Sequence, residues 1–143
     1  KADLVLVTHN HYDHYDRKAL DEILSPQTKL IVASDVPKED ERYSVLNNGE
    51  SASYEGIAIK AVASYNINRR NEQGNHFHPK GIGNGYILDF GGFSLYIAGD
   101  TEPILKLLIA LSISSNVLEE IVSGTTNSRG SSIMQPFSYS FTL

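Results

Sequence analysis

Three of the chain's five histidines and one aspartate lie within six consecutive positions, in the stretch VTHNHYDHY. Imidazole nitrogens and carboxylate oxygens are the strong metal ligands that remain to a protein without cysteine. On a helix, residues two positions apart point about 200° apart, so His9 and His11 could not both face one ion. The spacing therefore predicts a loop in which His9 and His11 clamp one metal ion. Asp13 and His14 would then reach a neighbouring ion.

A second candidate for metal binding is Asp100, in the stretch YIAGDT, where an apolar strand is expected to end. Taken alone, Gly-Asp-Thr ahead of Pro103 is equally compatible with a turn that caps a helix. Beside a histidine cluster, however, a carboxylate at the end of a strand is well placed to bridge two metal ions. We therefore include Asp100 in the predicted site.

The histidine cluster is expected to follow a buried strand and to precede a helix. Residues 2–7 form a nearly continuous apolar run, which is typical of a strand covered on both faces. Asp16 can cap the amphipathic segment 17–24, which Ser25-Pro26 ends. The run KLIVA, residues 29–33, predicts a second buried strand, and this strand–helix–strand order predicts an α/β layered fold.

The sequence from residue 36 to residue 98 predicts loops and antiparallel strands. Residues 36–53 are polar and predict a loop, with a short helix as the alternative and a turn at Asn47-Asn48-Gly49. Residues 57–63 predict a strand, and YILDF-GG-FSLYIA predicts a hairpin. The Gly- and Asn-rich segment between them, residues 66–85, predicts a long loop that contains His76 and His78. Loops of this length are often functional.

Composition narrows the partners that the protein could have. The net charge is −5 and the sequence has no basic stripe, which argues against nucleic acid as a partner. The longest apolar run, residues 104–113, is much shorter than the ~20 residues of a membrane span, and the opening KADLVLVT does not resemble a signal peptide. We therefore expect a cytoplasmic protein that acts on a small molecule. Arg69, Arg70 and Lys80 of the long loop could attract an anionic substrate.

Together, the two motifs resemble the metallo-β-lactamase superfamily. His9-x-His11-x-Asp13-His14 matches the signature of that family, and YIAGDT matches the strand that ends in its bridging aspartate. The combination of ASYN, HPKGIGNGYIL and LYIAGDT is most similar to the branch of ascorbate-6-phosphate-lactonase-like and related uncharacterised metal-dependent hydrolases. The resemblance implies an α/β fold that forms part of an αββα sandwich, with mixed sheets flanked by helices.

Carried over to this sequence, the resemblance implies a binuclear metal site. His9 and His11 would bind one ion and Asp13 and His14 a second, with Asp100 bridging the two. Zinc is the expected metal, although iron or manganese suits the same ligands. A metal-bound hydroxide, oriented by Asp13 as the catalytic residue, would attack a small ester, lactone or phosphoester.

The metal ion expected at His9 and His11 needs a third ligand, and the histidine that usually supplies it in the family is absent from this sequence. A third histidine is expected near residues 64–66, yet none is present there. Asn66 could replace it, or His76 or His78 could enter from the long loop. We favour His78 as the metal ligand, because Pro79 stiffens the chain that follows it.

The end of the sequence also departs from the family. No histidine follows His78, and residues 103–143 carry only four charged residues. We divide the chain into a core, residues 1–102, in which the first strands of the family fold are expected to be missing, and a tail, residues 103–143. A truncation, a frameshift or a divergent end would each explain this tail, in which a helix is predicted after Pro103. Weak or single metal occupancy is then expected. The alternative function is a non-catalytic relic or interaction module with a partial metal site, whose exposed sheet edges would favour homo-oligomers.

Overall fold

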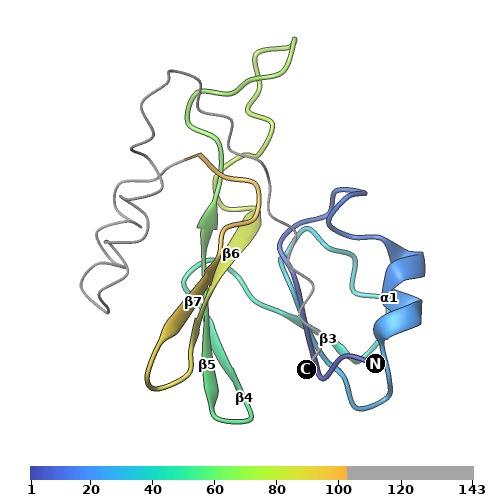
Figure 1. Ribbon diagram of the computed structural model, residues 1–143. Helices are drawn as coiled ribbons and strands as arrows, with labels where there is room; N and C mark the ends of the chain where they lie inside the picture. The colour runs from blue at the N-terminus through green and yellow to red at the C-terminus, as the bar shows by residue number, and fades with distance from the viewer. Residues whose placement is uncertain (103–143) are drawn as a thin grey trace, which may run out of the picture. The chain divides into compact units, whose positions relative to one another are not determined.

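The computed structural model of the 143-residue chain describes residues 1–102. The helix predicted after Pro103 and the predicted tail, residues 103–143, lie outside the described residues. The described part contains seven strands and one helix, which form two sheets with the helix beside one of them (Figure 1). In this part of the chain, no helix is long and apolar enough to cross a membrane.

The first sheet is parallel, with the strand order β1-β2-β3. β1 (Leu4–Val7) pairs with β2 (Lys29–Val32), which pairs with β3 (Tyr43–Val45). β1 and β2 are the two strands that the sequence predicts, each shorter than expected. β2 is buried except at Lys29, whereas in β1 only Val7 is fully buried. β3 lies in residues 36–53, for which the sequence predicts a loop. That prediction is wrong here, because three residues gain their strand conformation from pairing with β2 and from burying Tyr43.

The helix α1 (Arg17–Ile23) begins and ends where the sequence predicts. Asp16 is its N-cap, and its Oδ1 accepts hydrogen bonds from the backbone N–H groups of Lys18 and Ala19, at 2.8 and 3.3 Å. Leu20 and Leu24 carry the apolar stripe of the segment into a core cluster against the parallel sheet. The helix therefore covers one face of this sheet and fixes the end of the loop that contains the histidines.

The second sheet is antiparallel, with the order β4-β5-β6-β7. Its strands are β4 (Ser51–Tyr54), β5 (Ile57–Ser64), β6 (Gly83–Asp89) and β7 (Ser94–Ile97). The predicted strand at β5 and the predicted hairpin of β6 and β7 are confirmed. The long loop between β5 and β6 is also present.

β4 is a second strand in the region predicted as a loop. It is joined to β5 by a two-residue turn in which Glu55 and Gly56 have φ values of 48° and 83°. Turns with positive φ at both central residues match the twist of antiparallel strands, but glutamate is an unusual residue at the first position. The turn was missed for this reason, and β4 with it.

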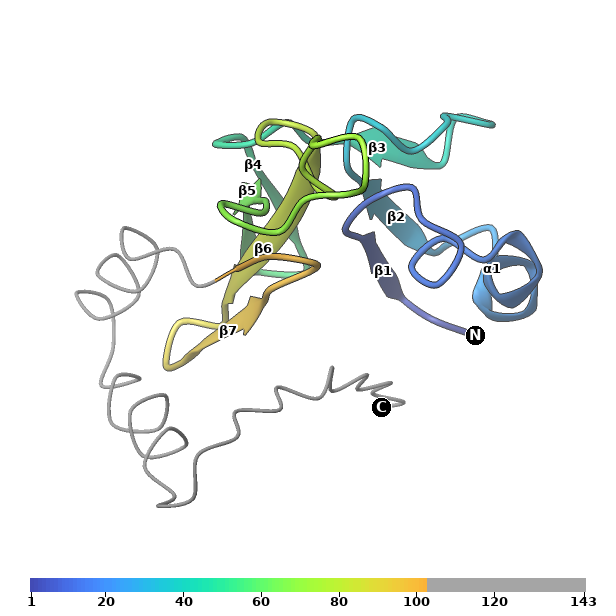
Figure 2. The same cartoon turned by 90° about the horizontal axis from the view of Figure 1, so that it is seen from above.

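Two cores form because alternate side chains of a strand point to opposite faces of the sheet. Val5 and Val7 of β1 pack in the cluster that contains α1, whereas Leu4 and Leu6 pack against the antiparallel sheet. Ile31 of β2 also belongs to this second cluster. The layers are thus helix, parallel sheet and antiparallel sheet (Figure 2).

Two hydrogen bonds join the sheets near the end of β1. The hydroxyl of Tyr86, which is fully buried in β6, donates to the carbonyl oxygen of Val7 at 2.8 Å. The backbone N–H of Asn84 donates to the carbonyl oxygen of Thr8 at 2.8 Å. The residues that follow β1 are therefore held against the start of β6, and this junction is where the histidine loop begins.

Candidate metal centre

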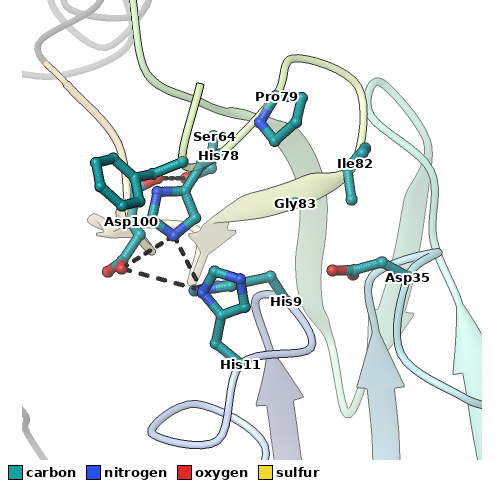
Figure 3. Close-up of a pocket in the computed structure, with 10 residues that line it drawn as sticks. His9, His11, Asp35, Ser64, His78, Pro79, Ile82, Gly83 and Asp100 are labelled. Carbon is teal, nitrogen blue, oxygen red and sulfur yellow. Dashed lines mark hydrogen bonds and ion pairs between the residues drawn. The ribbon is translucent and has the colours of Figure 1, made fainter. Parts of the chain in front are cut away.

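Four of the predicted ligands converge at the junction of the two sheets: His9, His11, His78 and Asp100 (Figure 3). One ligand atom from each lies within 4.8 Å of every other. His11 Nδ1 is 3.1 Å from His9 Nε2 and 3.2 Å from His78 Nε2. Asp100 Oδ2 is 3.3 Å from His78 Nε2 and 4.0 Å from His9 Nε2. Residues from three separate segments thus point at one common centre.

These separations match the donor set of a single transition-metal ion. Ligands about 2.0–2.1 Å from a tetrahedral ion lie roughly 3.3–3.4 Å from one another. Three of the six donor separations, 3.1–3.3 Å, lie close to that value, a fourth is 4.0 Å, and all six are within 4.8 Å. Three imidazoles and a carboxylate suit zinc, and they also suit iron or manganese. The residues present therefore fit a bound metal ion.

His9 is positioned and kept neutral by its surroundings. It follows β1 directly, is only 4% exposed, and its Nδ1 lies 3.0 Å from Thr8 Oγ1. This contact turns the Nε2 atom toward the centre. Burial, followed by repulsion from the neighbouring His14 and His11, lowers the pKa of His9 to about 4. His9 is therefore in the neutral form that binds metals at pH 7.

His78 reaches the cluster from the long loop, and Asn66 orients it. The Oδ1 atom of Asn66 accepts from the backbone N–H of His78 at 3.0 Å and lies 2.8 Å from its Nδ1. If Nδ1 carries the proton, Nε2 is free to face the centre. Burial lowers the pKa of His78 and so also favours its neutral form. The buried Asn66 therefore holds the His78 imidazole in place. The sequence analysis left open that Asn66 itself binds the metal.

His76 lies apart from this group. It forms an isolated β-bridge with Arg70 within the loop, and its Nδ1 has no hydrogen-bond partner among residues 1–102. Of the two loop histidines, the structure thus brings to the cluster the one that the sequence analysis favours.

Asp13 and His14 form a second group next to the first. His14 Nε2 is 3.2 Å from Asp100 Oδ1 and 3.9 Å from Asp13 Oδ2. Its Nδ1 lies 3.4 Å from Thr8 Oγ1, so one buried hydroxyl contacts the imidazoles of both groups. The two oxygens of Asp100 face different histidines. This is the arrangement that a bridging carboxylate requires.

Asp100 is placed by a tight turn after β7. Gly99 has a φ of 63°, and a Cβ atom there would lie 2.9 Å from the carbonyl oxygen of Asn84. The Ser64 hydroxyl is 3.0 Å from the carbonyl oxygen of Ala98 and 3.1 Å from that of Asp100. Ser64, the last residue of β5, thus fixes the turn that follows β7.

A pocket opens beside the cluster. Its other lining residues are Asp35, Ser64, Phe77, Pro79, Ile82 and Gly83. Asp35 lies across the pocket from Asp100 and accepts a hydrogen bond from the backbone N–H of Asn10 at 3.0 Å (Figure 3). Apart from the loop residues, sequence reasoning missed this lining, and it also missed Thr8. Thr8 directly precedes the motif, but nothing in its type shows that it contacts two imidazoles.

The fold and this site define a family. The sequence model of the protein family described as "Beta-lactamase superfamily domain" matches residues 1–131 of the chain. The chain therefore belongs to the β-lactamase superfamily, as the resemblance of its motifs implies.

Several relatives are named as metal-dependent hydrolases. A UPF0173 metal-dependent hydrolase of Thermoplasma acidophilum is 31% identical over 106 residues, 71% of this chain and 44% of that protein. A UPF0173 metal-dependent hydrolase of Archaeoglobus fulgidus is 31% identical over 112 residues, 75% of this chain and 48% of that protein. A proposed metal-dependent hydrolase from Parabacteroides distasonis, whose crystal structure is known, is 36% identical to this chain in sequence. The two structures superpose with a TM-score of 0.62, and the match covers 76% of this chain and 49% of that one. The chain thus spans about half the length of the relatives it matches.

Proposed function

We propose that the protein is a metal-dependent hydrolase, and that His9, His11, His78 and Asp100 bind its first metal ion. The observation that carries this proposal is the convergence of four donor atoms within 4.8 Å of one another. Membership of the β-lactamase superfamily and the names of the relatives support the reaction class.

Each residue has a distinct role in this proposal. His9, His11 and His78 supply neutral nitrogen donors, and Asp100 supplies negative charge to both groups of ligands. Asp13, whose side chain is 55% exposed and lies 3.9 Å from His14 Nε2, would accept a hydrogen bond from the attacking water and orient it. When bound, zinc or a similar ion would make water a nucleophile at neutral pH and would polarise the bond under attack.

The pocket suggests a small substrate. Phe77, Pro79 and Ile82 give it an apolar wall beside the metal ligands, as is usual for small-molecule sites. Arg69 lies near enough to help lower the pKa of His78, so positive charge lies near the ligands. We infer that the substrate is a small ester, lactone or phosphoester, with a preference for anionic compounds. We also place the protein in the cytoplasm.

The test compares the wild-type chain with His9→Ala/His11→Ala and with His76→Ala. Each is purified without added metal, its metal content is measured by elemental mass spectrometry, and its hydrolysis of a panel of esters, lactones and phosphoesters is then assayed with and without zinc. His76 is the matched control, because it is a histidine of the same chain that lies outside the cluster.

We expect metal and hydrolysis in the wild type and in His76→Ala, and neither in the double variant. A folded wild-type protein that retains no metal and gains no activity with zinc would overturn the proposal. The non-catalytic relic would then be the better account.

A further inference from the structure

One carboxylate closes the base of the loop that carries His78. Glu102 Oε1 accepts a hydrogen bond from the backbone N–H of Arg69 at 2.7 Å. Its Oε2 accepts from the backbone N–H groups of Ile67 and Asn68 at 3.1 and 2.9 Å. Three consecutive amides are thus satisfied by one side chain, and these bonds hold the pKa of Glu102 below its ordinary value.

The residues around Glu102 strengthen this attachment. The Thr101 hydroxyl lies 3.2 Å from the backbone nitrogen of Tyr65 and 3.1 Å from its carbonyl oxygen. The backbone N–H of Glu102 donates to the same carbonyl oxygen at 3.2 Å. Both residues that follow Asp100 are therefore bound to the start of the long loop: Thr101 to Tyr65, and Glu102 to Tyr65 and residues 67–69.

A continuous set of contacts then leads from this attachment to the metal ligand. Asn66 directly precedes the three clamped amides, and its backbone N–H donates to the carbonyl oxygen of His78 at 2.9 Å. Its side chain holds the His78 imidazole by Nδ1, as described above. The position of Asn66 thus depends on residues 67–69 on one side and on His78 on the other.

We propose that Glu102 is a positioning residue for the metal site, which acts through Asn66 and His78 by fixing the start of the long loop. The proposal rests on the proposed function only in taking His78 as a metal ligand. Residues 67–70 are exposed and contribute no side chain to either core cluster, so hydrogen bonds rather than packing hold this segment. Glu102 lies two residues after Asp100 in the sequence. In this proposal it also positions His78, which reaches the site from the long loop.

The test is a double-mutant cycle on zinc affinity, measured by competition with a chromogenic chelator. The variants are Glu102→Gln, His78→Ala and the two combined. Glutamine keeps the size of the side chain but replaces one acceptor oxygen with a donor, so it cannot satisfy all three amides. Glu72→Gln is the matched control, because it removes the same charge from an exposed position in the same loop.

We expect Glu102→Gln to weaken zinc binding roughly tenfold or more, as changes behind a metal ligand do, and Glu72→Gln to leave it unchanged. In the His78→Ala background, Glu102→Gln should cause no further loss, since its effect passes through His78. Full additivity of the two losses, or an equal effect of Glu72→Gln, would overturn the proposal.

Amide hydrogen exchange of the metal-free chain gives a second readout that does not need zinc. Glu102→Gln should speed exchange at residues 67–69 and also at the backbone N–H of His78, while Glu72→Gln should change neither. Faster exchange that stops at residues 67–69, or no change at all, would overturn the proposal. Absence of zinc binding in the wild type would instead refute the proposed function, and the exchange result would still decide the role of Glu102.

Discussion

At the scale of single residues, Asn66 is the most informative side chain to change. Its Oδ1 atom accepts from both the backbone and the ring of His78, at 3.0 and 2.8 Å. We expect Asn66→Ala to weaken zinc binding by about 10–100-fold, because the imidazole loses the contact that fixes its orientation and tautomer. Asn66→Asp keeps the acceptor oxygen and should retain most of the affinity. Isothermal titration with zinc measures both, and an Asn66→Ala protein with wild-type affinity would contradict this role.

The candidate metal ligands were easier to predict than the residues that position them. His9, His11, Asp13, His14 and Asp100 are indicated by residue type and spacing alone, since few other functions require such a pattern. The structure brings all of them to one place, which supports the prediction without testing their roles.

The positioning residues left no comparable signal in the sequence. Thr8 and Glu102 act through hydrogen bonds to partners that only the fold brings near, and Glu102 binds backbone amides, which every residue type possesses. In the sequence, the only reason to prefer His78 over His76 is that Pro79 stiffens the chain directly after His78. What decides between them is the contact of Asn66 with His78, a contact between residues 12 positions apart.

At the scale of elements, the turn after β7 leads to the clearest prediction of stability. Gly99→Ala should lower the free energy of unfolding by about 1–3 kcal/mol, because alanine is strained at a φ of 63° and its Cβ would meet Asn84, Thr8 and Ser64 at 2.9–3.2 Å. Gly92→Ala is the matched control. Gly92 lies in the β6–β7 hairpin, has no positive φ and has no atom within 4 Å of an added Cβ.

Urea denaturation of the metal-free variants measures this difference without any contribution from bound ions. Equal free energies of unfolding for Gly99→Ala and Gly92→Ala would show that the turn tolerates a side chain. The placement of Asp100 would then not depend on glycine.

Elements were predictable where the sequence pattern matched their burial. The continuous apolar runs at β1 and β2 indicate strands covered on both faces, and their alternate residues do enter two different cores. β3 and β4 were missed because neither has such a pattern. β3 has three residues, and β4 has the sequence SASY, so both depend on the strands beside them.

At the scale of the whole described unit, Tyr86 couples the two sheets. Tyr86→Phe should lower the free energy of unfolding by about 1–1.5 kcal/mol, because the carbonyl oxygen of Val7 loses one of its two donors and keeps only the backbone N–H of Ala33. Tyr96→Phe should change it by no more than about 0.5 kcal/mol, since the buried Tyr96 hydroxyl has no partner among residues 1–102. Chemical denaturation of the two variants provides the comparison. Equal losses would show that the hydroxyl of Tyr86 does not hold the sheets together.

Metal binding should stabilise this whole unit, since the four donors come from three segments that only the folded chain brings together. We expect one zinc ion per chain to bind tightly and a second weakly. The first group offers four donors, whereas in the described residues the second offers Asp13, His14 and an oxygen of the shared Asp100.

Zinc at 100 times its dissociation constant should raise the free energy of unfolding by about 2.7 kcal/mol, and a chelator should abolish the gain. Asp13→Ala should keep the tight ion and His78→Ala should bind it far more weakly, as measured by elemental analysis together with urea denaturation. Two equally tight ions would mean that the shared carboxylate equalises the two groups, so the stoichiometry decides whether Asp100 serves one metal ion first or both at once.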